Sequence, residues 1–591
     1  MFSELIETIN SIFDMLFHPI DTIYKLTAID NFKQKLSMKK EESFSAAYYK
    51  LVEGDKSTGV VYTPEDISLY IIKNTISDED IISNPFIKIV DPSCGCGNLI
   101  IPCFNYLREI YNRNLELINF KNELSITENK IDEHILKYNL YGFDIDSIAL
   151  KVLTIDLFIM SGCLPRNNFR SQDFLIEEIS EKFDVFIGNP PYVGQKVINK
   201  SYSAKIKQLY KNIYKDKGDL SYCFFQAAIN RLNKGGKITF ITSRYFLEAP
   251  SGAELRKTLK ETCSIYRIID FYGIRPFKKA GIDPLIIFLS NDLNFQQSIE
   301  TIKPLHNKGK QKKEFYNSLF LHKGNEYSKF YVNKNVLNSS GWVLIDNHQR
   351  SIVNKIESKC ITSLVNICSS YQGIITGCDR AFVVDMETII KRNLEQDIIK
   401  PWIKSSYIGK KSLRFEDTYL IYADLIADKD KYPNCINYIA EHKSKLLKRR
   451  ECEKGIRKWY ELQWGRKQQI FEKKKIIFPY KSSTNRFVKD SGSYFSADVY
   501  SLSINEGAPF TYDYLLFLLN SKTYEFYFKT FAKKLGEDIY EYYPNNLMKL
   551  CIPTMFIESN YEENRLYDFF EFTEEERNMI EQSIQNVKCK I

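Results

Sequence analysis

The sequence predicts an α/β protein in which a doubly wound, mostly parallel sheet is followed by a separate α+β domain. Apolar, strand-like runs alternate with helical stretches as far as about residue 290. Four of these runs end in polar residues, which is typical of the carboxyl edge of an open α/β sheet. Past about residue 345 the alternation stops, and short strand-like pieces such as 380–384 and 475–480 mix with a long helical run over 511–531.

Residues 1–57 are expected to be a helical extension. Leu5, Ile9, Ile12 and Leu16 recur at helical spacing on one face, and Pro19 ends the run. This face is expected to pack on the main body, and a helix that contacts a partner or DNA is the alternative. A second helix is expected to begin near Pro64.

Three strand ends in the first half carry carboxylates. Asp91 follows the strand at 86–90 and precedes a glycine loop, in which small residues allow a ligand to approach the backbone. Asp144 ends a second strand, where such folds place an acid against ribose hydroxyls, and Asp146 beside it either shares this role or caps the next helix. Asp173, followed by Phe174, is expected to meet an adenine ring.

The fourth strand, over 183–187, stops abruptly at Gly188-Asn189-Pro190-Pro191-Tyr192. Each proline fixes its own φ and restricts the preceding residue, so the Asn189 side chain and the Asn189 and Pro190 carbonyls become preset acceptors. Such acceptors suit an exocyclic amine with two N–H donors, and Tyr192 offers a flat face to an aromatic ring. An ordinary proline-rich turn is the alternative.

After this loop the sequence predicts a helix over 220–230 and three more strands, 237–242, 266–271 and 285–289. The short connection between the last two predicts an antiparallel hairpin at a sheet edge. Phe277, within that connection, either projects toward the site or packs in the core. Residues 291–345 are polar and are expected to form an exposed loop or linker.

Composition narrows the class of protein. The chain has 591 residues, 26% of them charged, and this length suits two to four domains. No apolar window is long enough to cross a bilayer, and the acidic N-terminus is unlike a secretory signal, so a cytoplasmic protein without a membrane partner is expected. The 13 cysteines lack Cys-x-x-Cys spacing, which predicts neither disulfides nor a metal site.

Positive charge is concentrated in one stretch. Residues 401–490 carry 22 Lys and Arg against 11 Asp and Glu, interleaved with aromatic residues, whereas the rest of the chain is slightly acidic. Such a block is typical of a surface that binds a polyanion, although a solvated basic face is the alternative. The candidate DNA contacts are Lys410, Lys411, Arg414, Arg449, Arg450, Arg457, Lys458, Arg466 and Arg486.

These motifs together resemble the γ-class, TaqI-like DNA adenine-N6 methyltransferases. Residues 58–64 resemble the family's cofactor-carboxylate motif, and residues 91–97 its glycine loop, with Cys96 where serine or alanine is commoner. Asn189-Pro190-Pro191-Tyr192 matches the catalytic motif, and Phe277 stands where the family places a second aromatic against the flipped base. Stretches 373–377 and 518–522 resemble its recognition domain, and orphan enzymes of clostridia are especially similar.

The resemblance implies a Rossmann-like methyltransferase domain at 58–335 and a DNA target-recognition domain at 336–591, after the extension at 1–57. It implies a monomer that transfers methyl from S-adenosylmethionine to N6 of an adenine flipped out of double-stranded DNA, in a bacterial, nucleoid-associated setting and without nuclease activity. A bifunctional restriction-modification enzyme and an RNA or protein amine methyltransferase are the alternatives. The implied cofactor contacts are Tyr62, Thr63, Asp91, Pro92, Ser93, Cys94, Gly95, Gly97, Asp144, Ile145, Asp173, Phe174, Asn189 and Pro191; the implied catalytic residues are Asn189, Pro190, Pro191 and Tyr192, with Tyr192 and Phe277 stacking on the base.

Overall fold

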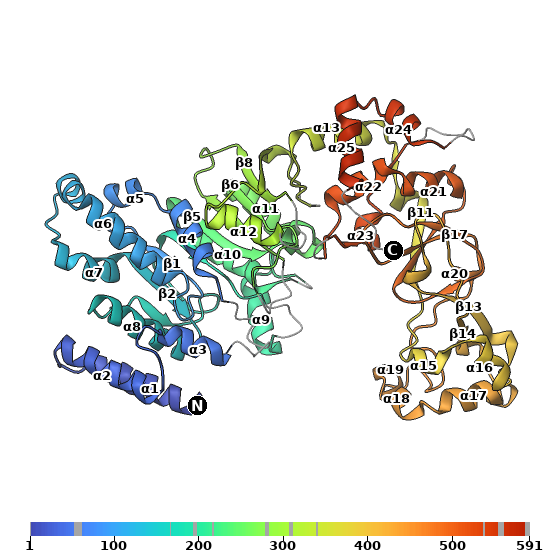
Figure 1. Ribbon diagram of the computed structural model, residues 1–591, viewed down its shortest axis with the longest axis horizontal. Helices are drawn as coiled ribbons and strands as arrows, with labels where there is room; N and C mark the ends of the chain where they lie inside the picture. Colours follow the sequence, from blue (N-terminus) through green and yellow to red (C-terminus); the bar gives the residue numbers. More distant parts are fainter. Residues whose placement is uncertain are drawn as a thin grey trace. The chain divides into compact units, whose positions relative to one another are not determined.

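The computed structural model describes residues 2–52, 62–165, 167–192, 198–215, 218–277, 283–305, 311–338, 341–535, 538–553 and 561–585. The chain divides into two compact units, an N-terminal unit of residues 1–344 and a C-terminal unit of residues 345–591 (Figure 1). The boundary expected at 335/336 falls a few residues earlier, and residues 1–57 belong to the first unit. Within the described residues, no helix is long and apolar enough to cross a membrane.

The N-terminal unit is built on one sheet, whose nine strands in the described residues run in the order β3-β2-β1-β4-β5-β7-β6-β8-β9. The first five are parallel, and the order reverses direction between β1 and β4, so their carboxyl ends meet where such folds bind ligands. The doubly wound sheet predicted from the sequence is therefore confirmed. The bounds are β1 Ile89–Asp91, β2 Leu140–Asp144, β3 Phe169–Ser171, β4 Phe183–Gly188 and β5 Leu232–Ser243.

The antiparallel hairpin is also confirmed, but the sheet continues past it. Strand β7 (Pro284–Ser290) runs antiparallel to both β5 and β6 (Ser264–Asp270). Residues 291–345, expected to be a linker, instead supply β8 (Ser298–Pro304) and β9 (Tyr327–Asn333). Strands β8 and β9 contain charged residues in place of an apolar run, and these charges are paired across the sheet. Glu300 of β8 binds Arg267 of β6 and Lys329 of β9.

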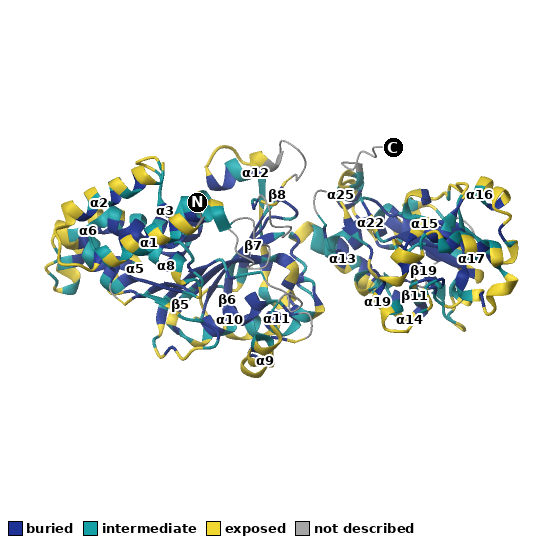
Figure 2. Cartoon of the chain, turned by 90° about the horizontal axis from the view of Figure 1, so that it is seen from below, coloured by how far each residue is buried: buried dark blue, intermediate teal, exposed yellow. Residues whose placement is uncertain are grey.

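Helices cover both faces of the sheet. Alternate residues of β4 enter two different cores, with Val185 and Ile187 on one face and Phe186 on the other, as expected for a strand buried on both sides. Figure 2 shows the strands largely buried and the outer helix surfaces exposed. One core is shared with α4 (Glu65–Thr75), α5 (Asp78–Ser83), α6 (Ile100–Asn122) and α12 (Gln311–Phe320), and the other with α9 (Lys200–Leu209), α10 (Leu220–Asn230) and α11 (Ala253–Thr262).

The N-terminal extension forms a layer on α8 (Ser147–Ser161). It consists of α1 (Phe2–Leu16), α2 (Thr22–Lys35) and α3 (Phe44–Val52), which lie beside α8 (Figure 1). The apolar stripe of α1 packs with α3 and α8 in one core, which agrees with the expectation that this face meets the main body.

The C-terminal unit is α+β. It contains a four-stranded sheet ordered β11-β19-β15-β17 and a second ordered β12-β14-β13-β18, counted over its described residues. The strand expected at 380–384 is mostly a helical turn, and the single helix expected at 511–531 breaks at Ser521, whose side chain caps the second half. The bounds are β11 Cys368–Gln372, β12 Val383–Val384, β13 Ile399–Ile403, β14 Tyr419–Ile421, β15 Lys475–Pro479, β17 Val488–Asp490, β18 Tyr494–Phe495, β19 Val499–Ile504, α13 Asn347–Lys359, α15 Asp379–Phe382, α16 Met386–Lys391, α17 Pro433–Ala440, α21 Tyr512–Asn520, α22 Lys522–Phe531, α24 Glu563–Phe569 and α25 Glu574–Gln585.

Candidate functional site

A cavity of about 570 Å³ lies at the carboxyl ends of the parallel strands. Its walls come from the segments that follow β1, β2, β3 and β4, and from α3, α9 and α10. Most of the site residues expected from the sequence are thereby brought together from positions far apart in the chain. The lining includes Thr63, Asp91, Pro92, Ser93, Cys94, Gly95, Asp144, Ile145, Asp173, Phe174, Asn189, Pro191 and Tyr192.

The glycine loop forms one wall of this cavity. Gly95 and Gly97 have positive φ values of 49° and 90°, and a Cβ at Gly97 would lie 2.3 Å from the Leu153 side chain. Asp91 is buried at the start of the loop, where its Oδ1 accepts a hydrogen bond from the Ser93 N–H at 3.0 Å. Burial raises the pKa of Asp91 to about 8, so this carboxyl is poised to gain a negative charge when a cation binds beside it.

Asp144 binds the loop from the second strand. Its two oxygens accept the Gly95 and Asp146 N–H groups, each at 2.8 Å, which fixes the carboxylate at the cavity wall. Burial raises its pKa. Asp146 caps α8 by accepting the Ile148 N–H at 3.0 Å, so the capping role considered for this residue is correct.

The third strand end supplies an apolar slot with polar rims. The Phe174 ring is buried and lies nearly parallel to Phe224 of α10, with centroids 6.3 Å apart. Asp173 lines the same region, with one oxygen accepting the Leu175 N–H at 2.9 Å.

Asn189 follows β4 directly and is held by two partners. Its Nδ2 donates to Thr63 Oγ1 at 3.0 Å, and its Oδ1 accepts a hydrogen bond from the Tyr192 hydroxyl. These contacts fix the orientation of the amide at the cavity wall. Pro190 is buried behind the loop, while Pro191 lines the cavity.

Several expected contacts do not line the cavity. Tyr62, which is 41% exposed, and Gly97 are not among the lining residues, and residues 58–61 of the cofactor-carboxylate motif lie outside the described residues. Phe277 is buried in the core with Phe271 and Phe315 and is not among the residues that line the cavity. Of the two interpretations of Phe277, the geometry favours the core aromatic and does not support base stacking.

Other lining residues escaped sequence reasoning. Tyr48, Tyr49 and Val52 come from α3, Gln172 precedes Asp173, and Tyr202 comes from α9. None belongs to a recognisable motif, because each reaches the cavity through the packing of a helix or turn. The only sequence signal for α3 was Phe44 and Tyr48 at helical spacing, which indicates a buried face but no ligand.

The donor set fits S-adenosylmethionine. Asp91, Asp144 and Asp173 offer carboxylates to a ligand with two positive centres and ribose hydroxyls. Ser93 Oγ and Gln172 Oε1 are buried in the cavity wall and have no hydrogen-bond partner among the described residues. Because unsatisfied buried polar atoms are costly, a polar ligand that pairs with them is favoured.

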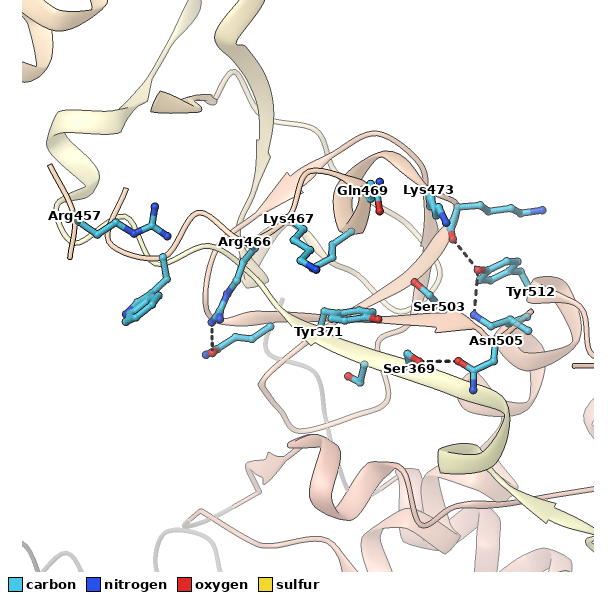
Figure 3. A pocket seen from close by; sticks show the side chains of 16 residues that line it. Ser369, Tyr371, Arg457, Arg466, Lys467, Gln469, Lys473, Ser503, Asn505 and Tyr512 are labelled. Atoms are coloured by element: carbon cyan, nitrogen blue, oxygen red, sulfur yellow. Dashed lines mark hydrogen bonds between the residues drawn. The ribbon is translucent and has the colours of Figure 1, made fainter. Parts of the chain in front are cut away.

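A second cavity, of about 1060 Å³, lies in the C-terminal unit and is called the basic groove (Figure 3). Arg466, Lys467 and Lys473 lie on one side and face Ser369 and Tyr371 of the edge strand β11. No carboxylate occurs among its described lining residues, whereas amides and hydroxyls are common. The groove is lined by Ser369, Ser370, Tyr371, Gln372, Arg457, Trp464, Arg466, Lys467, Gln469, Ile470, Lys473, Lys474, Ser503, Ile504, Asn505 and Tyr512.

The aromatic and basic residues of the 401–490 block have divided roles. Trp464 is 38% exposed in the groove, but Trp402 and Phe471 are fully buried, so much of the aromatic content builds the core. Arg457 and Arg466 line the groove. Five of the predicted DNA contacts are exposed outside it: Lys410, Lys411, Arg414, Arg450 and Lys458.

Two predicted DNA contacts hold the backbone of the unit instead. Arg449 is buried, and its guanidinium donates to the carbonyls of Thr376 at 3.1 Å and Glu461 at 2.9 Å, among others. Arg486 donates to the Ile408 carbonyl at 3.0 Å. These donors are engaged within the fold, and the DNA contacts expected at the two residues stay predictions.

Comparisons with known proteins agree with this arrangement. Residues 138–277 match the family described as Eco57I restriction-modification methylase, and residues 400–552 match the TaqI-like C-terminal specificity domain. One stretch of the N-terminal unit is thus similar to a methylase family, and one stretch of the C-terminal unit is similar to a specificity-domain family. The N-terminal unit is called the methylase unit below, and the C-terminal unit the specificity unit.

Individual relatives point the same way. The chain is 23% identical over 538 residues to the type II methyltransferase M.BstVI of Geobacillus stearothermophilus, covering 86% of this chain and 92% of that protein. It is 26% identical over 384 residues to M.HindII of Haemophilus influenzae, covering 60% and 71%. The chain is thus related to the type II restriction-modification DNA methyltransferases, and S-adenosylmethionine is its expected cofactor.

The fold has a solved counterpart. The type IIL restriction-modification enzyme MmeI, determined in complex with DNA, superposes with a TM-score of 0.59 and 15% sequence identity over 86% of this chain and 70% of that one. At this identity the match establishes a shared fold.

Proposed function

We propose that this protein methylates N6 of an adenine flipped out of double-stranded DNA, at a specific sequence and without nuclease activity. The observation that carries the proposal is the position of Asn189, which lines the same cavity as Asp91 and Asp144 and whose amide is held by Thr63 and Tyr192. An exocyclic amine and a methyl donor would therefore meet in one enclosure. The enzyme would act as a monomer in the bacterial cytoplasm, independent of a partner subunit.

The chain's residues have defined roles in this reaction. Asn189 Oδ1 and the Pro190 carbonyl would accept the two N6 hydrogens, which favours a pyramidal nitrogen with an available lone pair. When bound, S-adenosylmethionine supplies a methyl group to that lone pair, the C–S bond breaks onto sulfur, and the methylated amine loses its extra proton to water. Acceleration comes from holding the amine in line and from acceptors that are already oriented.

Tyr192 supports the base as well as the amide. Its hydroxyl bonds Asn189, and its ring lines the cavity, so a flipped purine can stack on it. Extruding the base costs a few kcal/mol, which stacking and the amide contacts offset. The methylase unit provides this platform without Phe277.

The basic groove is the proposed DNA contact of the specificity unit. Lys467 and Lys473 of the lining would attract phosphates, while Arg457 is paired with Asp424 at 3.1 Å, and serine, glutamine and asparagine side chains would bond base edges. Replacing Lys467 and Lys473 by glutamine should weaken DNA binding and lower the slope of log K against log salt by about 2. Lys391→Gln, at an exposed lysine of the same unit that does not line the groove and is not a predicted DNA contact, is the matched control and should leave the slope unchanged.

Sequencing of cellular DNA tests the reaction itself. The protein and its Asn189→Ala variant are expressed in a host without adenine methylation, and genomic DNA is read by a modification-sensitive method. We expect one sequence motif with methylated adenine for the wild type and none for the variant. Modified cytosine, or labelled methyl recovered in RNA or protein with unmodified DNA, would contradict the proposal.

A further inference from the structure

Helix α3 of the N-terminal layer reaches the methylase cavity, although it precedes the motifs of the methylase unit. Tyr48, Tyr49 and Val52 line the cavity on the side where Thr63 and Asp146 also lie. The helix is therefore part of the enclosure in which the donor would bind. Neither matched domain covers this segment.

Two buried contacts fix α3 on the body of the unit. Asp156 of α8 is buried, and its carboxylate accepts the N–H groups of Phe44 at 3.0 Å and Ser45 at 2.9 Å, at the start of α3. The Phe44 ring is fully buried in the core that α1, α3 and α8 share. The position of α3 thus depends on a carboxylate more than 100 residues away in the chain.

Each tyrosine binds a different segment of the cavity wall. The Tyr48 hydroxyl donates to Asp146 Oδ2 at 2.8 Å, next to the expected ribose acid Asp144. The Tyr49 hydroxyl accepts the Tyr62 N–H at 2.9 Å, and the two rings pack with centroids 4.9 Å apart.

The second contact continues toward the reacting amide. Tyr62 is followed by Thr63, whose hydroxyl accepts from Asn189 Nδ2 at 3.0 Å. One helix is consequently connected to the ribose end of the expected donor site through Tyr48 and to the catalytic amide through Tyr49.

We propose that α3 forms part of the S-adenosylmethionine site and that its residues Tyr48 and Tyr49 are positioning residues. The inference rests on the proposed function, because it takes that donor as the ligand. Donor binding and docking of the N-terminal layer stabilise each other, since a ligand that contacts only the docked arrangement favours it. Tyr48 holds Asp146 at the ribose end, and Tyr49 holds the 62–63 segment against Asn189.

Conservative variants test the two contacts. Tyr48→Phe and Tyr49→Phe keep the rings and remove one hydroxyl each, and Asp156→Ala removes the cap of α3. Asp21→Ala is the matched control, because Asp21 caps α2 of the same layer, is exposed and does not line the cavity. Circular dichroism and thermal melting first establish that each variant is folded.

Donor affinity is measured by isothermal titration of S-adenosylmethionine without DNA. We expect each Tyr→Phe variant to raise Kd about fivefold, which corresponds to one net hydrogen bond, and the Asp156 variant to raise it more. Asp21→Ala should bind as the wild type does. In steady-state methylation the Tyr→Phe variants should raise KM for the donor and leave KM for DNA unchanged.

Hydrogen exchange provides a readout that is independent of affinity. Adding S-adenosylmethionine to the wild type should slow exchange of the Phe44–Val52 amides, whereas the amides of α2 change less. Unchanged exchange in α3, or Tyr48→Phe and Tyr49→Phe variants with wild-type Kd, would overturn the inference while leaving the proposed function intact. A wild type that binds no S-adenosylmethionine would overturn both.

Discussion

The buried carboxyl of Asp91 makes donor affinity depend on pH. Its pKa is about 8 in the free protein because burial disfavours the charged form, so about nine-tenths of the molecules carry a neutral Asp91 at pH 7. A ligand with an ammonium group and a sulfonium favours the carboxylate and lowers that pKa. Binding therefore releases a proton, and affinity rises with pH until about 8.

The magnitude follows from the pKa. If Asp91 is ionised in the complex throughout the range, the donor Kd is about 50-fold higher at pH 6 than at pH 8, an average of about sevenfold per unit. Titration calorimetry in buffers of different ionisation enthalpy at pH 7 should report release of close to one proton. Asp91→Asn should bind more weakly and with a much flatter pH profile. A wild-type Kd that is constant from pH 6 to 8, with buffer-independent heats, would refute this reasoning.

The raised pKa of Asp91 makes folding stability fall with rising pH, whereas it makes donor affinity rise. Because the folded pKa of Asp91 lies above the unfolded value, the folded state holds the proton more tightly. The contribution of this carboxyl to stability is greatest below the unfolded value near 4 and is lost as the pH rises toward 8. In urea unfolding, the free energy of unfolding of the wild type should fall relative to that of Asp91→Asn as the pH rises from about 4 to about 8. The free energy of unfolding of the variant should depend less on pH.

Variants at three further residues separate roles in the structure. Tyr192→Phe should keep base stacking and reduce kcat/KM about fivefold, because the Asn189 amide loses its partner. Tyr192→Ala should reduce kcat/KM by a further factor of about 5 to 150, which is the range for one stacked base. Equal losses in the two variants would contradict the two roles. Asp144→Ala should raise donor Kd about tenfold or more, because it also frees the Gly95 N–H, with unchanged DNA affinity in a gel-shift assay. Arg449→Met should lower the unfolding free energy of the specificity unit by about 2–4 kcal/mol in urea, since several buried carbonyls lose their donor, and Lys411→Met should change it by less than about 0.5 kcal/mol.

The sequence predicted the parallel half of the sheet and the edge at which its site forms. Asp91, Asp144 and Asn189 were recognisable because buried apolar strands end abruptly at polar residues, and that signal is local. Strands β8 and β9 were missed because Glu300 and Lys329 compensate each other across the sheet, which a single strand's pattern does not reveal. Phe277 was ambiguous for a similar reason, since an aromatic residue in a connection has the same sequence signature whether it faces a ligand or a core.

The sequence also could not show which basic residues stabilise the fold and which line the groove. Arg449 and Lys467 lie in the same charged block, yet one is buried against main-chain carbonyls and the other lines the groove. Tyr48 and Tyr49 likewise reach the cavity only because Asp156 anchors their helix. Such roles depend on contacts between distant segments, which spacing along the chain does not encode.

The order of the two units along the chain bears on how such a protein diversifies. Every described residue that lines the cavity of the methylase unit precedes Leu344, and every described residue that lines the basic groove follows Ile345. Under the proposed function, recombination near this junction would replace the surface that recognises the target sequence and would keep every described residue of the other cavity. Substitutions in the groove would likewise change the preferred target sequence without replacing a residue at which the methyl group is transferred.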